Sequence, residues 1–357
     1  MTDLALAALD AIPRVRLGHA PTPLDRAATL GSELGIDLYI KRDDCTGLAF
    51  GGNKVRQLEF YLGAARAEDA DTILITGAVQ SNFVRTAAAA ARTLGMDIHI
   101  QLEERVPDVD ESYRRSGNVL LDKLLGAQLS TFPVGEDESA ADAALEDLAA
   151  DLADKGRRPY VIHLGVEHPP LGALGYVVAA RELQTQMAEC NLAFDHVVVA
   201  SGSALTHGGL LVGLRALGNP VPVSGICVRR GAPEQHARVL KRCREIAALI
   251  GKHDCVEERD VVVSDAVLAP GYGQLNAATV SAMARAARLE ALMLDPVYTG
   301  KTMAGLIALA RDGVLQADAR VLFVHTGGGP AIFGYERTLS KHLQELDQSG
   351  QVLDSAP

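Results

Sequence analysis

Two glycine-rich segments of the sequence have residue types suited to binding an anion and to placing a reactive amine. Segment 200–209 reads Ala-Ser-Gly-Ser-Ala-Leu-Thr-His-Gly-Gly, and segment 50–54 reads Phe-Gly-Gly-Asn-Lys. In the first, glycines allow close approach, while backbone N–H groups and the hydroxyls of Ser201, Ser203 and Thr206 can bind phosphate oxygens. The segment has neither the lysine of a Walker motif nor the G-x-G-x-x-G spacing of a dinucleotide site. We therefore expect it to bind one small phosphate group rather than ATP or NAD.

Segment 50–54 places Lys54 after two glycines and Asn53, where a helical pattern begins. By itself this segment also fits an ordinary helix start that carries a solvated lysine. Together with a phosphate loop, and without a motif of metal-ligating residues, it favours pyridoxal phosphate as the cofactor. In such enzymes a lysine forms the Schiff base, a loop holds the phosphate, and the cofactor ring stores carbanion charge.

A third polar segment, 76–82, lies between a predicted strand and a predicted helix. It reads Thr-Gly-Ala-Val-Gln-Ser-Asn, so Gln80, Ser81 and Asn82 fall at the start of the helix. Small polar side chains and free helix N–H groups suit a carboxylate, and an ordinary N-cap explains the same residues equally well. Both interpretations stay open from the residues alone.

Two tyrosines and a threonine stand at turns near the end of the chain. Tyr272 lies in Ala-Pro-Gly-Tyr-Gly, and Tyr298 lies in Asp-Pro-Val-Tyr-Thr-Gly-Lys. Packing at the edge of the core is an alternative for both, but turn positions favour a functional role. Thr326 follows an apolar run and precedes three glycines.

The elements that must position these residues alternate along most of the chain. Short β-branched runs are followed by long alanine-rich amphipathic stretches, a pattern typical of parallel sheets covered by helices, whose ligands bind at the carboxyl ends of the strands. Strands are predicted over 38–41, 72–76, 98–102, 196–200, 223–228 and 321–325. Helices are predicted over 54–67, 82–94, 140–155, 172–187, 206–217, 233–250, 275–289 and 302–310. The acidic stretch 135–155 is interpreted as a solvent-facing helix.

Composition limits the class of protein. The 357 residues are 48% hydrophobic and 22% charged, which permits a large core and argues against disorder. The net charge of −11 is a poor match for nucleic acid. The five cysteines are widely spaced without a C-x-x-C pair, so we expect neither a disulfide framework nor a zinc site, and a reducing, cytoplasmic location. The most apolar segment, 196–218, contains His207 and Arg215 and is not a membrane span.

The motifs, taken in order over about residues 13–335, resemble the D-cysteine desulfhydrase / 1-aminocyclopropane-1-carboxylate deaminase family of fold type II pyridoxal phosphate enzymes, to which L-cysteate sulfo-lyase is closely related. The matching blocks are Gly-Gly-Asn-Lys54, Gln80-Ser-Asn82, Ser201-Gly-Ser with Thr206, Gly271-Tyr-Gly273, Asp295-Pro-Val-Tyr-Thr-Gly-Lys301 and His325-Thr-Gly-Gly328.

This resemblance implies an α/β fold of two domains, similar to the β subunit of tryptophan synthase, with mostly parallel sheets wrapped by helices. Residues 1–49 with 166–345 are expected to form the larger, cofactor-binding domain, 50–165 the smaller domain and 346–357 a tail. The resemblance also implies pyridoxal 5'-phosphate as cofactor, a small amino acid as substrate, a homodimer, and no metal, nucleic-acid or membrane partner.

By similarity, Lys54 binds the cofactor and then moves the Cα proton, Ser81 binds the substrate carboxylate, and Tyr272 and Tyr298 act as acid, base or leaving-group contacts. The implied cofactor-binding residues are Lys54, Asn53, Asn82, Ser201, Gly202, Ser203, Thr206, Thr299 and Thr326. The implied substrate-binding residues are Gln80, Ser81, Asn82, Phe83, Glu167, Tyr272 and Tyr298.

Thr299 and Thr326 bear on the reaction. In the deaminase branch the corresponding motifs read Tyr-Glu-Gly-Lys and His-Leu-Gly-Gly, with the glutamate at the pyridine nitrogen. A hydroxyl there leaves a weaker electron sink, which suffices when electrons depart with a β-leaving group. The resemblance therefore implies β-elimination to pyruvate and ammonia, with D-cysteine desulfhydrase as the nearest activity. L-cysteate sulfo-lyase, another β-substituted amino acid lyase, the deaminase and a non-catalytic binding protein are the alternatives.

Three positions depart from the family pattern. Phe83 replaces a common histidine, Leu205 replaces a usual glycine, and Glu167-His168 stand where relatives often read Ser-Asn. Phe83 and Leu205 are compatible with neutral packing changes. Glu167 beside a substrate would repel a sulfonate, which counts against cysteate and favours a cationic or amino-bearing side chain.

Overall fold

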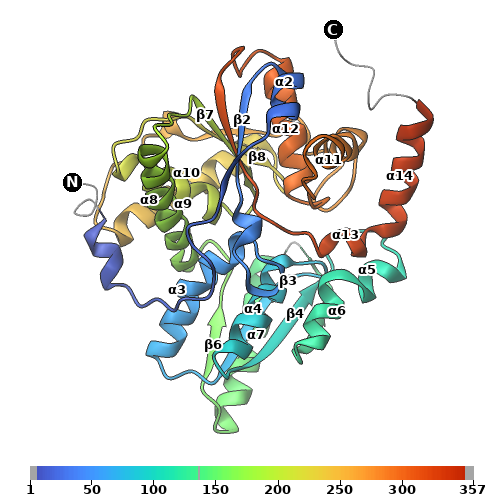
Figure 1. Ribbon diagram of the computed structural model, residues 1–357. Coiled ribbons are helices and arrows are strands. Elements are labelled where there is room, and N and C mark those ends of the chain that lie inside the picture. Colours follow the sequence, from blue (N-terminus) through green and yellow to red (C-terminus); the bar gives the residue numbers. More distant parts are fainter. Residues whose placement is uncertain (1–5, 136, 350–357) are drawn as a thin grey trace.

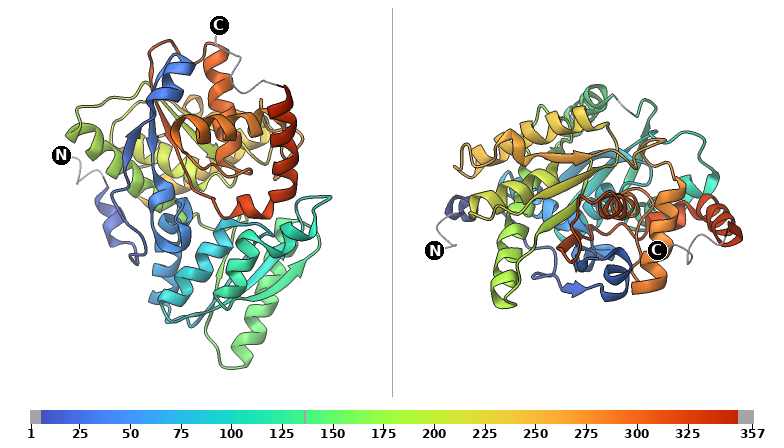
Figure 2. Two further views of the ribbon diagram at one scale, coloured as in Figure 1. Left: turned by 45° about the vertical axis from the view of Figure 1, so that its right-hand side comes forward. Right: turned by 90° about the horizontal axis from the view of Figure 1, so that it is seen from above.

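The structure is a computed structural model that describes residues 6–135 and 137–349, and its two sheets occupy separate halves of the molecule (Figure 1). The larger sheet has the strand order β1-β2-β10-β7-β8-β9, and the smaller has β5-β4-β3-β6. Among the described strands every pair is parallel except β1 with β2. The left view of Figure 2 has the same division into halves.

The strands are β1 Leu24–Arg26, β2 Asp37–Lys41, β3 Thr72–Ala78, β4 Asp97–Glu103, β5 Gln128–Phe132, β6 Pro159–Ile162, β7 His196–Ser201, β8 Val223–Cys227, β9 Val262–Ser264 and β10 Arg320–Val324. The α-helices are α2 Ala28–Leu34, α3 Asn53–Ala67, α4 Asn82–Thr93, α5 Glu111–Arg115, α6 Gly117–Leu124, α7 Glu138–Asp154, α8 Leu174–Glu189, α9 Leu205–Ala216, α10 Ala232–Leu249, α11 Ala277–Glu290, α12 Thr299–Arg311, α13 Ala331–Gly334 and α14 Glu336–Ser349.

Helices cover both faces of the larger sheet because its central strands are apolar on both sides. In β7, Val197 and Val199 join a core with α8, α9 and α10, whereas Val198 joins a second core with α2, α11 and α12. The smaller sheet packs against α3 and α4 on one face and against α7 on the other. The prediction of parallel sheets wrapped by helices is therefore confirmed.

A buried ion-pair network fixes α3 against the larger half. Arg56 of α3 donates to Asp43 and to Glu182 of α8, each over 2.9 Å, and Lys41 donates to the same Glu182 over 2.5 Å. Removing one partner would leave an uncompensated buried charge, so the network holds the start of α3 in one place.

The C-terminal prediction needs a correction. Residues 346–349 belong to α14 rather than to a tail, because Leu346 is buried against Val280 and Ala284 of α11. Residues 350–357 lie outside the described part, and the domain boundaries remain a prediction. No helix in the described ranges combines the length and apolar character needed to cross a membrane.

Candidate active site

The main candidate site is a cavity at the carboxyl ends of β3, β7, β8 and β10, where the segments that follow these strands meet. Ligands of open parallel sheets bind at such ends. The structure brings together eleven of the residues that the sequence singled out. These are Asn53, Lys54, Ser81, Asn82, Phe83, Gly202, Ser203, Thr206, Tyr272, Tyr298 and Thr326.

Lys54 stands in the first turn of α3, held by two loops in close contact. A Cβ on Gly327 would lie 2.6 Å from the Cα of Gly52, whose φ of +113° also requires glycine. The Lys54 amine donates to Gln57 over 3.2 Å and lies 4.8 Å from the centre of the Phe83 ring. Burial lowers the pKa of this amine to about 8. The cavity thus holds a lysine that is partly neutral near pH 7.

This lowered pKa predicts how the cofactor-free protein takes up pyridoxal phosphate. The neutral amine is the nucleophile toward an aldehyde, and its fraction rises with pH until the pKa is passed. With a pKa of about 8, the rate of Schiff-base formation should rise roughly tenfold from pH 6 to pH 7 and level off above about pH 9. Stopped-flow absorbance measures the rate of Schiff-base formation at each pH. This rate is then divided by the rate that Nα-acetyl-lysine shows at the same pH. A ratio that does not decline between pH 8 and pH 10 would contradict it.

The loop between β7 and α9 has the features of a phosphate cup. Its backbone turns at Ala204, with a φ of +71°, so that the first-turn N–H groups of α9 face the cavity end of the helix. Thr206 accepts hydrogen bonds from Asn53 over 2.8 Å and from Gln57 over 2.9 Å, which leaves its hydroxyl proton free to donate. A Cβ on Gly202 would approach Val228 to 3.1 Å and narrow the cup. The residues present therefore fit a phosphate group.

The start of α4 offers donors on the other side of Lys54. Ser81 is the N-cap, and its hydroxyl oxygen accepts from the N–H groups of Phe83 and Val84 over 3.2 and 3.4 Å. Its own proton is therefore available to a carboxylate at the helix N-terminus. Asn82 accepts from Asn118 over 2.9 Å through Oδ1, which leaves its amide N–H groups as donors.

The two predicted tyrosines face each other at the cavity. The hydroxyls of Tyr272 and Tyr298 lie 2.8 Å apart, with the rings at 69°. Burial, followed by the neighbouring Tyr272, raises the pKa of Tyr298 well above its usual range. Tyr298 is therefore a neutral proton donor at physiological pH and not a base.

Thr326 and Thr299 have different surroundings. Thr326 lines the cavity, and its carbonyl accepts from the Asn53 N–H over 3.0 Å. Thr299 is fully buried, and its hydroxyl donates to Asp295 and accepts from the Asp295 N–H, each over 2.7 Å. Thr299 does not line the cavity, because its hydroxyl belongs to the turn that starts α12, and its contact with the cofactor stays a prediction.

Three other residues expected at the site do not line the cavity either. Ser201 is buried beneath the cup, where its oxygen accepts from Gln235 over 2.9 Å. The amide of Gln80 points away from the cavity, donating to the carbonyls of Tyr113 and Ser116 over 2.5 and 2.9 Å. The Glu167 side chain is 81% exposed and pairs with Lys241 over 3.2 Å. Glu167 therefore lies outside the cavity, and its position gives no support to the expected repulsion of a sulfonate substrate.

Several polar residues at the site were not predicted from the sequence, and most of them have partners that are remote in the chain. Gln57 and Asn118 orient Thr206 and Asn82, as described above. Arg105 lines the cavity and pairs with the buried Glu103 over 2.7 Å. Glu138 of α7 also lines the cavity and pairs over 2.7–3.2 Å with three arginines: Arg229, Arg230 and Arg238.

The fold and the cavity define a pyridoxal phosphate enzyme, and the family comparison agrees. Residues 15–327 match the family described as pyridoxal-phosphate dependent enzyme, and the chain belongs to this family. The chain is 44% identical to the D-cysteine desulfhydrase of Salmonella choleraesuis (strain SC-B67) over 331 residues, which cover 92% of this chain and 97% of that protein. The enzymes of Salmonella paratyphi C (strain RKS4594) and Salmonella newport (strain SL254) have the same name, identity and coverage.

Solved structures agree on the fold. A structure described as an ACC deaminase homologue has a TM-score of 0.85 and 34% identity, covering 96% of this chain and 100% of that one. The L-serine ammonia-lyase of Rhizomucor miehei has a TM-score of 0.65 at 17% identity, covering 92% and 98%, which supports the fold alone. The predicted family, fold class and cofactor are therefore confirmed.

Proposed function

We propose that the protein is a pyridoxal phosphate-dependent lyase that converts D-cysteine and water to pyruvate, ammonia and sulfide. The observation that carries this proposal is the 44% identity, over nearly the full length of both chains, to curated D-cysteine desulfhydrases. The site supports the proposal, because four groups line one cavity. They are the Lys54 amine, the phosphate cup between β7 and α9, the donors at the start of α4 and the Tyr298 hydroxyl.

The cofactor and Lys54 have different roles in the reaction. When bound, pyridoxal phosphate supplies an aldehyde that condenses with amines and a ring that accepts electron density from Cα. Lys54 holds the cofactor at rest, and the neutral form of its amine, whose pKa burial lowers to about 8, then accepts the substrate Cα proton. The apolar Phe83 ring excludes water from one side of this amine.

The remaining residues bind and orient the substrate. Ser81 and the N-terminus of α4 bind its carboxylate, and the Asn82 amide donates to the cofactor hydroxyl. Tyr298, kept neutral and hydrogen-bonded to Tyr272, donates a proton or hydrogen bond to the departing sulfur. Gly202, Ser203, Asn53 and Thr206 hold the phosphate.

With Thr299 outside the cavity, Thr326 is the threonine that would lie beside the ring of a bound cofactor, and it would favour elimination over ring opening. Thr326 brings a hydroxyl to the cavity, whereas the nearby Asp295 carboxylate is fully buried and accepts from the N–H groups of Val297, Tyr298 and Thr299. A hydroxyl leaves the ring a weaker electron sink than a carboxylate does, which fits a substrate whose β-substituent removes the electrons.

The arginines favour a second candidate, release of sulfite from cysteate. Arg105, Arg229 and Arg238 line the cavity, and among the residues that the structure describes one carboxylate, Glu138, lines it with them. Arginine is well suited to binding an oxyanion through parallel N–H groups. Because Glu167 lies outside the cavity, its charge does not oppose these arginines, and the arginines favour a sulfonate substrate.

A substrate panel tests the proposal against its alternatives. Pyruvate release is measured with both cysteine enantiomers, cysteate, β-chloroalanine, diaminopropionate and 1-aminocyclopropane-1-carboxylate. We expect the highest kcat/KM for D-cysteine. A higher kcat/KM for cysteate would transfer the assignment to the sulfite-releasing lyase, and a cofactor-bound protein inactive on every substrate would support a non-catalytic binding protein. We further propose that the protein is a cytoplasmic homodimer. Each chain would consist of the two domains expected above.

A further inference from the structure

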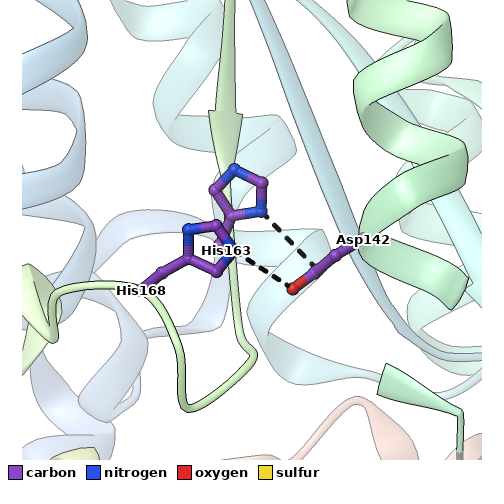
Figure 3. Close-up of side chains that lie close together, drawn as sticks. All are labelled: Asp142, His163 and His168. Atoms are coloured by element: carbon purple, nitrogen blue, oxygen red, sulfur yellow. Dashed lines mark ion pairs between the residues drawn. The ribbon is translucent and has the colours of Figure 1, made fainter. Parts of the chain in front are cut away.

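We infer that Asp142, His163 and His168 form a binding site for a divalent transition-metal ion of the zinc class, a feature that goes beyond the proposed function (Figure 3). The three side chains come from α7, from the segment just after β6 and from the loop that follows. Their ligand atoms lie within 4.8 Å of one another, and none of the three residues lines the catalytic cavity. Two imidazoles and a carboxylate form a donor set that zinc accepts, with a fourth position for water.

The distances suit an ion between the ligands. Nδ1 of His163 lies 3.7 Å from Oδ1 of Asp142, and Nε2 of His168 lies 3.7 Å from Oδ2 of the same carboxylate. Both distances are too long for good hydrogen bonds. A zinc ion about 2.0–2.1 Å from each ligand atom joins atoms up to about 4.2 Å apart. Each histidine is thus placed to share an ion with Asp142.

The surroundings of His163 suit a metal ligand. Its Nε2 lies 2.8 Å from Oε1 of Glu146 and donates its proton there, the arrangement that orients histidine ligands in metal sites. Nδ1 is then left with a lone pair that is buried without a hydrogen-bond partner and faces the Asp142 carboxylate. Asp142 and Glu146 thus place carboxylates on two sides of the His163 ring, at 3.7 and 2.8 Å from its two nitrogens.

The loop is built to approach α7 closely. A Cβ on Gly165 would lie 2.6 Å from the Asp142 carboxylate, so a larger residue would displace either that carboxylate or the loop. Arg242 of α10 donates to the carbonyls of Gly165 and His168 over 2.7 and 2.8 Å and fixes the turn between them. The charge of Arg242 is balanced by Glu245 at 2.6 Å.

The histidine rings adopt an arrangement that metal binding must change. They stack with centroids 3.6 Å apart and planes within 5°. Parallel rings cannot both direct lone pairs at one ion, so one ring must turn. His168, with 40% of its side chain exposed against 14% for His163, has the freedom to turn. The nearby Lys241 forms an ion pair with Glu167 over 3.2 Å.

A bound ion would brace one wall of the catalytic cavity. Asp142 lies one helical turn after Glu138, which lines the cavity, and His163 directly precedes Leu164, which also lines it. The ion would join α7 to the segment 163–168, and through Arg242 to the larger half. We therefore expect it to act on stability rather than to take part in the reaction.

The test uses untagged holoenzyme treated with a chelator and dialysed. Isothermal titration with Zn²⁺ should give one site per chain, and Zn²⁺ at a hundred times its Kd should raise the melting temperature by roughly 3 °C. Mg²⁺ at the same concentration should give no shift, because it prefers oxygen ligands. Zn²⁺ affinity should fall at least tenfold in H168N and in D142N, and about tenfold in E146Q.

The control is H253N, which removes an exposed histidine elsewhere and should keep the native Zn²⁺ affinity. Visible absorbance of the bound cofactor verifies that each variant is folded, independently of activity on any substrate. Native protein without stoichiometric Zn²⁺ binding would overturn the inference. Native affinity in both H168N and D142N would overturn it as well.

Discussion

Replacing Lys54 with alanine is expected to abolish turnover and the visible absorbance of lysine-bound pyridoxal phosphate. Lys54 lines the cavity beside the phosphate cup, and burial lowers the pKa of its amine to about 8. No other lysine lines this cavity in the described part of the chain. Loss of both the cofactor linkage and the base predicts at least a thousandfold fall in kcat. Absorbance scans and pyruvate release, measured on the purified variant, check both effects.

A second lysine supplies the matched control. Burial also lowers the pKa of Lys301 to about 8, but its amine donates to the carbonyls of Leu268 and Gly271, outside the cavity. K301M should keep the cofactor absorbance, although loosening the loop that precedes Tyr272 reduces kcat. If K301M loses the absorbance while K54A keeps it, the assignment of the cofactor lysine is wrong.

Replacing Tyr298 with phenylalanine is the substitution with the second largest expected effect. The Tyr298 hydroxyl is held neutral by burial and lies 2.8 Å from the Tyr272 hydroxyl. We expect kcat to fall roughly a hundredfold, because the departing group loses its proton donor, while KM changes less than threefold. Steady-state kinetics of pyruvate release, with the absorbance of the bound cofactor measured in parallel, check this expectation.

Tyr113 offers a control of the same chemistry outside the cavity. It is buried and forms an edge-on pair with Tyr335, with ring centroids 5.2 Å apart. Y113F should retain kcat within about twofold, since this residue does not line the cavity. Equal losses in Y298F and Y113F would mean that the loss in Y298F reflects packing rather than proton donation.

The sequence predicted strongly patterned elements well. The apolar runs at 72–76 and 196–200 become β3 and β7, and each differs from its prediction by two residues or fewer. The pattern missed β5, Gln128–Phe132, because an exposed edge strand has a polar sequence. It also missed β6, Pro159–Ile162, whose first residue is a proline.

The site was predictable where its residues belong to loops that lead into a predicted helix. Lys54, Ser81 and Thr206 stand at helix starts whose neighbouring residues already indicate ligand binding. Ser201 and Thr299 belong to equally suitable motifs, but the fold turns their hydroxyls toward Gln235 and Asp295. Motif membership does not give side-chain direction, which depends on contacts with residues that are remote in the chain.

The acidic stretch 135–155 illustrates what tertiary structure adds. Composition favoured a solvent-facing helix, and α7 does form there. Two of its acidic residues, one helical turn apart, nevertheless face inward. Glu138 meets three arginines from segments around β8 and α10, and Asp142 meets His163 and His168. A charge run alone does not predict these partners.

The most direct test of the central proposal is the product balance of the native holoenzyme with D-cysteine. Sulfide and pyruvate are quantified over time in an anaerobic reaction, with K54A as the blank. The proposed function predicts equal amounts of the two products from native enzyme and neither from K54A. Native enzyme that holds its cofactor but forms no sulfide from D-cysteine would contradict it.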